Sequence, residues 1–181
     1  MLKKFKLLKR TELRKSNILD YCVDTYELPN GAVEEYDIML HNGAAAVVAV
    51  TDEGKIIMVS QYRPAFDRIT TEIPAGKRDG DEDFEAAAAR ELEEETGYRA
   101  GRMRHLITVD TAIAYCNEKI EIYIADRLEK TEQHLDEDEF IEIREFSPEE
   151  LKEKIFKAEI QDSKTIAAIM SYIAFISDNK E

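Results

Sequence analysis

Cysteine is scarce in this 181-residue chain, and its two cysteines, Cys22 and Cys116, lie far apart in the sequence. A single distant pair provides no disulfide framework of the kind that stabilises small secreted domains. We therefore expect the protein to work in a reducing compartment, the cytoplasm.

Long apolar runs are also missing. Residues 1–15 are basic, but their apolar residues stand singly or in pairs and do not form the continuous run of a signal peptide. No later segment approaches the roughly 20 apolar residues that a membrane-spanning helix needs. The sequence predicts no membrane partner, and the basic segment is interpreted as a solvated or salt-bridged end.

Positive charge is in short supply, with 25 Lys and Arg against 39 Asp and Glu and a formal net charge of −14. This balance disfavours nucleic acid and anionic membranes as partners, because both are polyanions. A small anionic substrate remains compatible, provided that cations and local arginines screen its charge.

Several catalytic motifs do not occur. The histidines His41, His105 and His134 are scattered without HExxH spacing, and the chain has no GxSxG, P-loop or CxxC motif. Zinc-protease, serine-hydrolase, P-loop and dithiol chemistries therefore receive no support.

One segment has an excess of acid, and it is predicted to be helical. Asp83 is a candidate cap, residues 86–89 are alanines, and Gly97 suits a left-handed helix end, so we expect a helix over residues 83–96. Glu91, Glu94 and Glu95 stand at i, i+3 and i+4, which places three carboxylates on one face. Acids near a helix C-terminus oppose the helix dipole, so a compensating charge is expected.

Two interpretations of this acidic face are open from the residues alone. One is a solvated surface, where charged residues are normally found. The other is a cation site, because clustered carboxylate oxygens are the ligands preferred by Mg²⁺ and Mn²⁺.

The spacing favours the second interpretation, because residues 76–98 resemble the Nudix box, G-x5-E-x7-R-E-U-x-E-E-x-G-U with U a bulky apolar residue. Tyr98 stands at the last apolar position. The other positions are filled by Gly76, Glu82, Arg90, Glu91, Leu92, Glu94, Glu95 and Gly97.

Motifs outside the box resemble the ADP-ribose pyrophosphatase-like branch of the Nudix hydrolases. They are ELPNG at residues 27–31, QYRP at 61–64, EIPAGK at 72–77 and DEDE at 136–139. The resemblance implies a Mg²⁺-dependent enzyme that cleaves the pyrophosphate of a nucleoside diphosphate sugar, with ADP-ribose first and GDP-mannose as an alternative. A non-catalytic, Nudix-like nucleotide-sensing module is the alternative of another class, although the box carboxylates are all present here.

The resemblance also implies residue roles at the metal. Glu91 and Glu95 match the principal metal ligands, and Glu94, Glu82 and the carbonyl of Ala75 match further ones. Arg90 is expected to hold the box glutamates by charge-assisted hydrogen bonds. Arg90 and Glu94 are counted with the catalytic residues.

Substrate and proton-transfer roles come from the same resemblance. Arg63 matches a clamp on a substrate phosphate, for which a guanidinium is well shaped. Glu137 is the first choice for the base that deprotonates water, with Glu139 second. Glu118 matches a substrate-binding acid, but the Ser-Pro-Gly turn common before it in the family is replaced by residues 112–114, Ala-Ile-Ala. A broadened sugar preference is therefore expected.

The predicted architecture is an α/β Nudix fold, an α/β/α sandwich around a mixed sheet. Residues 1–42 are expected to form a β-hairpin extension that serves a homodimer, and residues 43–181 the hydrolase domain. Strands are predicted over residues 18–28, 36–40, 44–50, 55–62, 105–109, 120–125 and 140–146, and further helices over 151–157 and 163–176.

Overall fold

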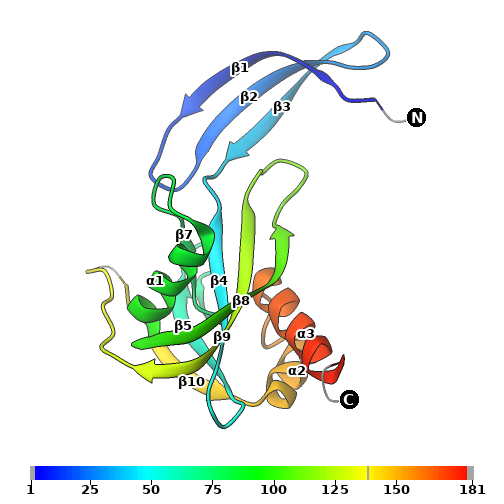
Figure 1. Ribbon diagram of the computed structural model, residues 1–181. Helices are drawn as coiled ribbons and strands as arrows, with labels where there is room; N and C mark the ends of the chain where they lie inside the picture. Colours follow the sequence, from blue (N-terminus) through cyan, green and yellow to red (C-terminus); the bar gives the residue numbers. More distant parts are fainter. Residues whose placement is uncertain (1–2, 138, 179–181) are drawn as a thin grey trace. The chain divides into compact units, whose positions relative to one another are not determined.

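The structure, a computed structural model, describes residues 3–137 and 139–178 (Figure 1). The chain forms two compact units. The first holds the residues up to 43 together with Asp110–Lys119, and the second holds Ala44–Val109 and the residues from Ile120 onward.

The first unit is a three-stranded antiparallel sheet in the order β1 (Lys6–Arg14), β2 (Asp20–Glu27) and β3 (Val33–Leu40). The predicted hairpin is β2 and β3, joined by a turn in which Gly31 has a φ of 86°. Strand β1 is additional to the prediction, because the sequence indicates a solvated or salt-bridged end for the basic segment and not a strand.

The pairing of β1 with β2 explains this difference. Arg10 lies opposite Asp24, and its Nε and Nη2 donate to the two carboxylate oxygens at 2.7 and 2.6 Å. Asp24 is completely buried, so its pairing with Arg10 offsets a large desolvation cost. Lys6 and Arg10 thus pair with acids on the neighbouring strand, a match that no local pattern reveals.

The segment Asp110–Lys119 joins the first unit through β3. The backbone N–H of Met39 donates to the carbonyl of Tyr115 at 2.7 Å, and the N–H of Asn117 donates to the carbonyl of Met39 at 3.2 Å. This segment contains Glu118, so the position of that residue is set within the first unit.

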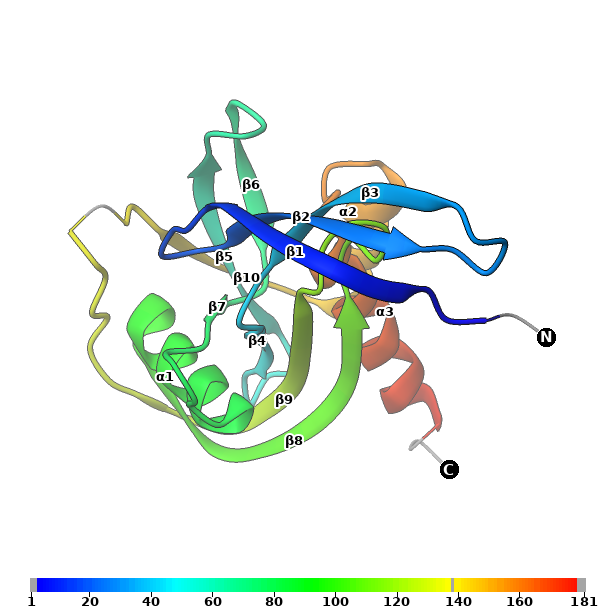
Figure 2. The same ribbon diagram turned by 90° about the horizontal axis from the view of Figure 1, so that it is seen from above.

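The second unit is built on a seven-stranded mixed sheet with the order β10-β5-β4-β9-β8, in which β6 also pairs with β5 and β7 with β4. Strands β4 and β9 are parallel, whereas β5 is antiparallel to β4, β6 and β10. Figure 2 shows β5 and β6 as a projecting hairpin. The strands are β4 (Ala44–Val50), β5 (Ile56–Arg63), β6 (Arg68–Glu72), β7 (Ala75–Lys77), β8 (Tyr98–Asp110), β9 (Lys119–Lys130) and β10 (Glu142–Phe146).

Helices cover both faces of this sheet. The helices are α1 (Phe84–Thr96), α2 (Pro148–Phe156) and α3 (Ser163–Asp178), with α1 on one side and α2 and α3 on the other (Figure 1). Strand β4 is buried on both faces, and its alternate residues enter two separate cores. Ala45, Val47 and Ala49 pack with Ala87, Ala88 and Leu92, whereas Ala44, Ala46 and Val48 pack with Leu151, Ala168 and Ile169. The predicted α/β/α sandwich is confirmed.

The caps of α1 are those that the sequence suggests. Asp83 accepts hydrogen bonds from the N–H groups of Glu85 and Ala86, and Gly97 adopts a left-handed conformation with a φ of 66°. Strands β6 and β7 were not predicted, because each is short and is defined by its partner strand rather than by its own pattern. None of the helices in the described part of the chain is long and apolar enough to cross a membrane.

Candidate active site

The C-terminal half of α1 brings the predicted carboxylates together. Ala87, Ala88 and Leu92 anchor the helix in the core, and this orientation also buries Glu95, which is 4% exposed. The side chain of Glu91 is 13% exposed and that of Glu94 is 40% exposed. The acidic face therefore grades from solvent into the interior, unlike the face of an ordinary solvated helix.

Arg90 connects most of these acids. Its Nη1 donates to Glu91 at 2.7 Å and to Glu94 at 2.9 Å, while its Nε and Nη2 donate to the two oxygens of Glu82 at 3.1 and 2.9 Å. Nη2 also donates to the carbonyl of Lys77 at 3.1 Å. The hydrogen bonds from Arg90 lower the pKa of Glu82. One guanidinium thus orients three carboxylates against the loop that precedes the helix.

The loop at β7 closes the other side of the cluster. The backbone N–H of Ala75 donates to Oε2 of Glu95 at 2.9 Å. At Gly76, a Cβ atom would lie 2.1 Å from the carboxyl carbon of Glu91. A side chain at position 76 would displace the Glu91 carboxylate from its place beside Arg90, which accounts for the first glycine of the box.

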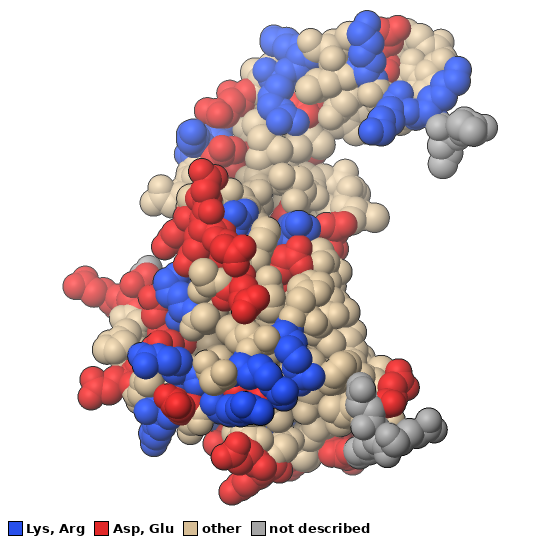
Figure 3. Space-filling view, in the orientation of Figure 1, with Lys and Arg blue, Asp and Glu red and all other residues tan. Residues whose placement is uncertain are grey.

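Negative charge at this cluster is not fully balanced. Burial raises the pKa of Glu95 to about 8, and the charges of Glu91 and Glu139 raise it as well, against the lowering effect of the Ala75 N–H. Burial also raises the pKa of Glu91, although Arg90 opposes this shift. Figure 3 shows acidic side chains gathered over α1 and the loop before it. A site of this kind gains free energy from an added cation.

The donor set fits a hard divalent cation, since it consists of carboxylate oxygens and backbone groups. Within residues 3–137 and 139–178, no three His, Cys, Asp or Glu side chains converge closely enough to form a metal site as they stand. Glu91 and Glu94 instead bond to Arg90, and Glu95 bonds to Ala75. Binding a cation here requires the glutamates to turn from these partners.

The two candidate bases differ in their electrostatic relation to this cluster. Both Glu137 and Glu139 are exposed and lie in the segment before β10. The charge of Glu139 raises the pKa of both Glu91 and Glu95, which places it near the carboxylate face. Glu139 Oε2 also accepts from the N–H of Asp136 at 3.2 Å, which orders its side chain.

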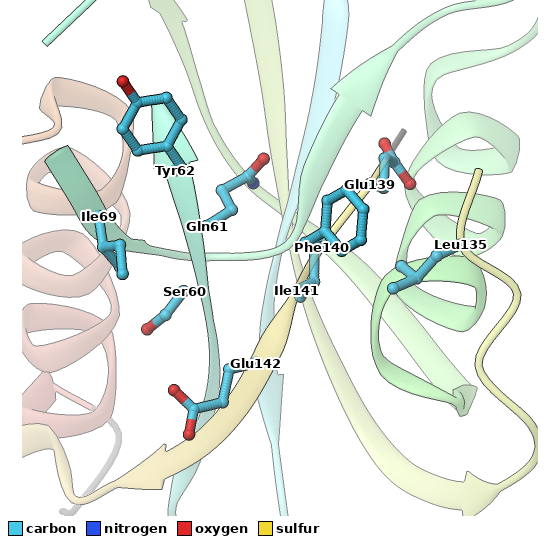
Figure 4. A pocket seen from close by; sticks show the side chains of 9 residues that line it. All are labelled: Ser60, Gln61, Tyr62, Ile69, Leu135, Glu139, Phe140, Ile141 and Glu142. Carbon is cyan, nitrogen blue, oxygen red and sulfur yellow. The ribbon is translucent and has the colours of Figure 1, made fainter. Parts of the chain in front are cut away.

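A hollow of about 480 Å³ lies beside Glu139. Figure 4 shows Gln61 and Tyr62 of β5 on one side of it and Glu139 and Phe140 on the other. The remaining lining residues are Ser60, Ile69, Leu135, Ile141 and Glu142. Its mixture of aromatic, amide and carboxylate groups suits a polar organic ligand with a flat face.

Arg63, the predicted phosphate clamp, ends β5 and forms a forked ion pair with Glu72. Its Nε and Nη2 donate to the two carboxylate oxygens at 2.8 and 2.7 Å. Lys164 of α3 donates to the same carboxylate at 2.5 Å, and Thr70 donates at 2.6 Å. The sequence alone assigned no role to Glu72 or Lys164. The available signal was a lysine in the first turn of a predicted helix, where the dipole disfavours a cation.

Glu118 is not placed with these residues, since it belongs to the first unit. Its Oε2 accepts from the hydroxyl of Thr111 at 2.7 Å, and its Oε1 lies 3.6 Å from Nδ1 of His41. The structure thus gathers Glu82, Arg90, Glu91, Glu94, Glu95 and Ala75 around α1, with Glu139 near them.

Fold and site together define an enzyme of the α/β class with a carboxylate-lined centre. The NUDIX domain family matches residues 40–169, and the chain belongs to this family of hydrolases.

Comparisons with individual proteins agree with this family membership. The chain is 40% identical to an ADP-ribose pyrophosphatase of Bacillus subtilis (strain 168), over 91% of this chain and 90% of that protein. It is 42% identical to a methanol dehydrogenase activator of Bacillus methanolicus, with the same coverage of 91% and 90%. A crystal structure of ADP compounds hydrolase superimposes with a TM-score of 0.89 at 21% identity, covering 99% of this chain and 98% of that one.

Proposed function

We propose that this Nudix hydrolase is Mg²⁺-dependent and cleaves the pyrophosphate bond of a nucleoside diphosphate sugar. ADP-ribose, split to AMP and ribose 5-phosphate, is the first candidate substrate. The observation that carries the chemistry is the incompletely neutralised pair of the partly buried Glu91 and the buried Glu95, whose pKa values are both raised. Similarity to an ADP-ribose pyrophosphatase along nearly the whole chain supports the substrate class.

The metal would be held by Glu91 and Glu95, with Glu94, Glu82 and the carbonyl of Ala75 as further donors, and Mn²⁺ is a suitable substitute. When bound, such a cation neutralises the pyrophosphate and lowers the pKa of a coordinated water. Arg90, which also donates to the carbonyl of Lys77, would stay beside the glutamates as they turn toward the cation.

For the base we place Glu139 ahead of Glu137, reversing the order suggested by the sequence. A base must reach the water at the metal cluster, and Glu139 lies close enough to act on both Glu91 and Glu95. The carboxylate of Glu139 would take one proton from the attacking water.

Substrate contacts are proposed for Arg63 and Glu118. The guanidinium of Arg63 matches two phosphate oxygens at once. The hollow beside Glu139 would receive one end of the substrate, and Gln61 and Tyr62 line it directly before Arg63. For Glu118 the support is its match to a substrate-binding acid of the family, although the Ser-Pro-Gly turn common before that acid is replaced here by Ala-Ile-Ala at residues 112–114.

We propose a homodimer in which the extension at residues 1–42 contacts a second copy, while residues 43–181 carry the chemistry. The support is apolar exposure on the sheet: Leu7, Leu8 and Val33 are 45%, 46% and 56% exposed. Light scattering at micromolar concentration should give a dimer mass. An active monomer would contradict this assembly.

A cytoplasmic location is proposed because Cys22 and Cys116 are both free thiols. No nucleic acid or membrane partner is proposed for a chain with a net charge of −14.

A panel of nucleoside diphosphate sugars tests the function. Initial rates of product release should be high for ADP-ribose with Mg²⁺, retained with Mn²⁺ and abolished by a chelator. Because the turn at residues 112–114 is altered, at least one other sugar nucleotide, with GDP-mannose in the panel, should reach a kcat/KM within about tenfold, or about 1.4 kcal/mol. Tight binding without turnover of any panel member would favour the sensing module instead.

A further inference from the structure

Glu72 has an unusual number of strong donors for one carboxylate. Both its oxygens are engaged by the Arg63 fork, and Lys164 and Thr70 donate to them as well. The residue is 3% exposed, so water does not contribute much to its solvation. Two full cations therefore meet one buried anion on the inner side of β6.

Lys164 is held firmly in this position. Its side chain is 11% exposed, and Nζ also donates to Asp162 at 2.9 Å. Asp162 accepts from the N–H of Thr165 at 3.0 Å, which makes it a cap of α3, and the buried hydroxyl of Thr165 accepts from the N–H of Ile73 at 3.0 Å. The start of α3 is thus fastened to the residue that follows Glu72. A lysine in a first helical turn opposes the dipole, so its place is explained by the carboxylate that it contacts.

Arg63 differs from Lys164 in its access to solvent. Its side chain is 40% exposed, while Lys164 is nearly enclosed. The charges of both Arg63 and Lys164 interact with that of Glu95, so both cations lie close to the carboxylate centre, and their exposure is what distinguishes them. Of the two cations on Glu72, Arg63 is the one that an incoming anion can reach.

A cation that leaves Glu72 must not leave a buried, unpaired carboxylate behind, because such a charge is strongly destabilising. We propose that Lys164 is a positioning residue that keeps Glu72 paired and in place while Arg63 transfers its guanidinium from Glu72 to a substrate phosphate. The inference rests on the proposed role of Arg63 as the phosphate clamp. Lys164 itself does not touch the substrate in this scheme.

Binding of α,β-methylene-ADP, a diphosphate that cannot be cleaved at its bridge, tests the proposal by calorimetry in the presence of Mg²⁺. Lys164→Met should weaken binding by about tenfold, and Lys164→Arg should restore it to within about threefold. In an Arg63→Gln background, Lys164→Met should change affinity by less than about twofold, because no clamp remains to be released. Lys154→Met, which breaks the ion pair between Lys154 on α2 and Glu159, is the matched control.

Other results would contradict the proposed transfer of Arg63 from Glu72 to the substrate. Equal losses from Lys164→Met in the wild-type and Arg63→Gln backgrounds would show that Lys164 acts on the ligand directly. Unchanged affinity in Lys164→Met, or no binding by the wild type, would show that no such transfer occurs. Should Lys164→Met fail to fold, Lys164→Gln takes its place with the same expectations.

Kinetics separate this inference from the proposed function. With a hydrolysed sugar nucleotide, Lys164→Met should raise KM while kcat stays within about threefold. A wild type that cleaves no sugar nucleotide, but in which the effects of substitutions at positions 63 and 164 on affinity are coupled as expected, would contradict the proposed function. The proposed role of Lys164 would then still hold. If the wild type cleaves ADP-ribose but substitutions at positions 63 and 164 change affinity independently, only the proposed role of Lys164 is contradicted.

Discussion

Glu72 and Glu95 are both buried, at 3% and 4% exposure, but their pKa values move in opposite directions. Burial alone raises both. At Glu72 the hydrogen bonds from Arg63 and the charge of Lys164 outweigh burial and lower the pKa to about 2. At Glu95 a backbone N–H and the charge of Lys164 oppose burial, but nearby acids add to the effect of burial, so the pKa rises to about 8.

The difference distinguishes a cluster whose charges are balanced within the protein, at Glu72, from one that keeps an excess of negative charge, at Glu95. The protein supplies its own cations to Glu72, with Arg63 and Lys164 on the same carboxylate. In the cluster around Glu95, the guanidinium of Arg90 is shared among Glu82, Glu91 and Glu94, and the Glu95 carboxylate accepts a hydrogen bond from the backbone N–H of Ala75. An added divalent cation would balance the second cluster, which is the physical basis for proposing the metal site at α1.

The variant with the largest expected effect is Glu95→Gln, which tests whether the excess charge at Glu95 serves to bind a metal. The substitution keeps the shape but removes a charge that a metal would need, so kcat should fall by about a thousandfold, or about 4 kcal/mol, without loss of the fold. Steady-state rates at saturating Mg²⁺ measure the effect. Glu93→Gln, on the same helix but paired with Arg99, is the control. Near-normal turnover in Glu95→Gln would remove Glu95 from the metal ligands.

The second prediction concerns the balanced cluster. Glu72→Gln leaves the cations of Arg63 and Lys164 without their shared anion, and unfolding free energy should drop by about 3 kcal/mol. Urea denaturation measures the change. Glu53→Gln, at an exposed acid beside Lys55, should stay within about 0.5 kcal/mol of wild type. If both variants unfold alike, Glu72 does not stabilise the fold through its ion pairs.

The third prediction separates the two candidate bases. Glu139→Gln should lower kcat by about a hundredfold with little change in KM, and high pH should recover part of the loss because hydroxide replaces the base. Glu137→Gln should have the smaller effect, since Glu139 is the acid that acts on Glu91 and Glu95. A larger loss in Glu137→Gln would restore the order suggested by the sequence.

The smallest expected effect is a pH dependence of stability. The pKa of Glu72 is about 2 in the folded chain against 4.5 for a free glutamate, so its charge stabilises the fold above pH 4.5. This contribution is lost as the pH falls toward 2. Between pH 6 and pH 3, the stability difference between wild type and Glu72→Gln should shrink by about 2 kcal/mol. Denaturation curves at several pH values measure it, and a constant difference would show that the pKa of Glu72 is not lowered.

The sequence predicted features whose causes are local. The helix at α1 follows from the Asp83 and Gly97 caps around a run of alanines, and its i, i+3, i+4 glutamates share a face whatever the helix packs against. The buried strand β4 follows from seven consecutive apolar residues. Box spacing identified the family, because the positions of glycine, arginine and glutamate are fixed relative to one short loop and helix.

Pairings between segments that are distant in the sequence could not be predicted from it. Strand β1 became visible only through the match of Arg10 to Asp24, and β6 and β7 only through β5 and β4. The contact of Lys164 with Glu72 joins residues 92 positions apart. Neither residue belongs to the box, so no motif spacing connects them.

The capped acidic helix and the spacing of a Nudix hydrolase can be read from the amino-acid order, because those properties depend on neighbours along the chain. The folded structure is needed to show which buried glutamate is paired and which is left with surplus charge. A pKa depends on burial and on the charges within a few ångströms, and both are properties of the folded arrangement.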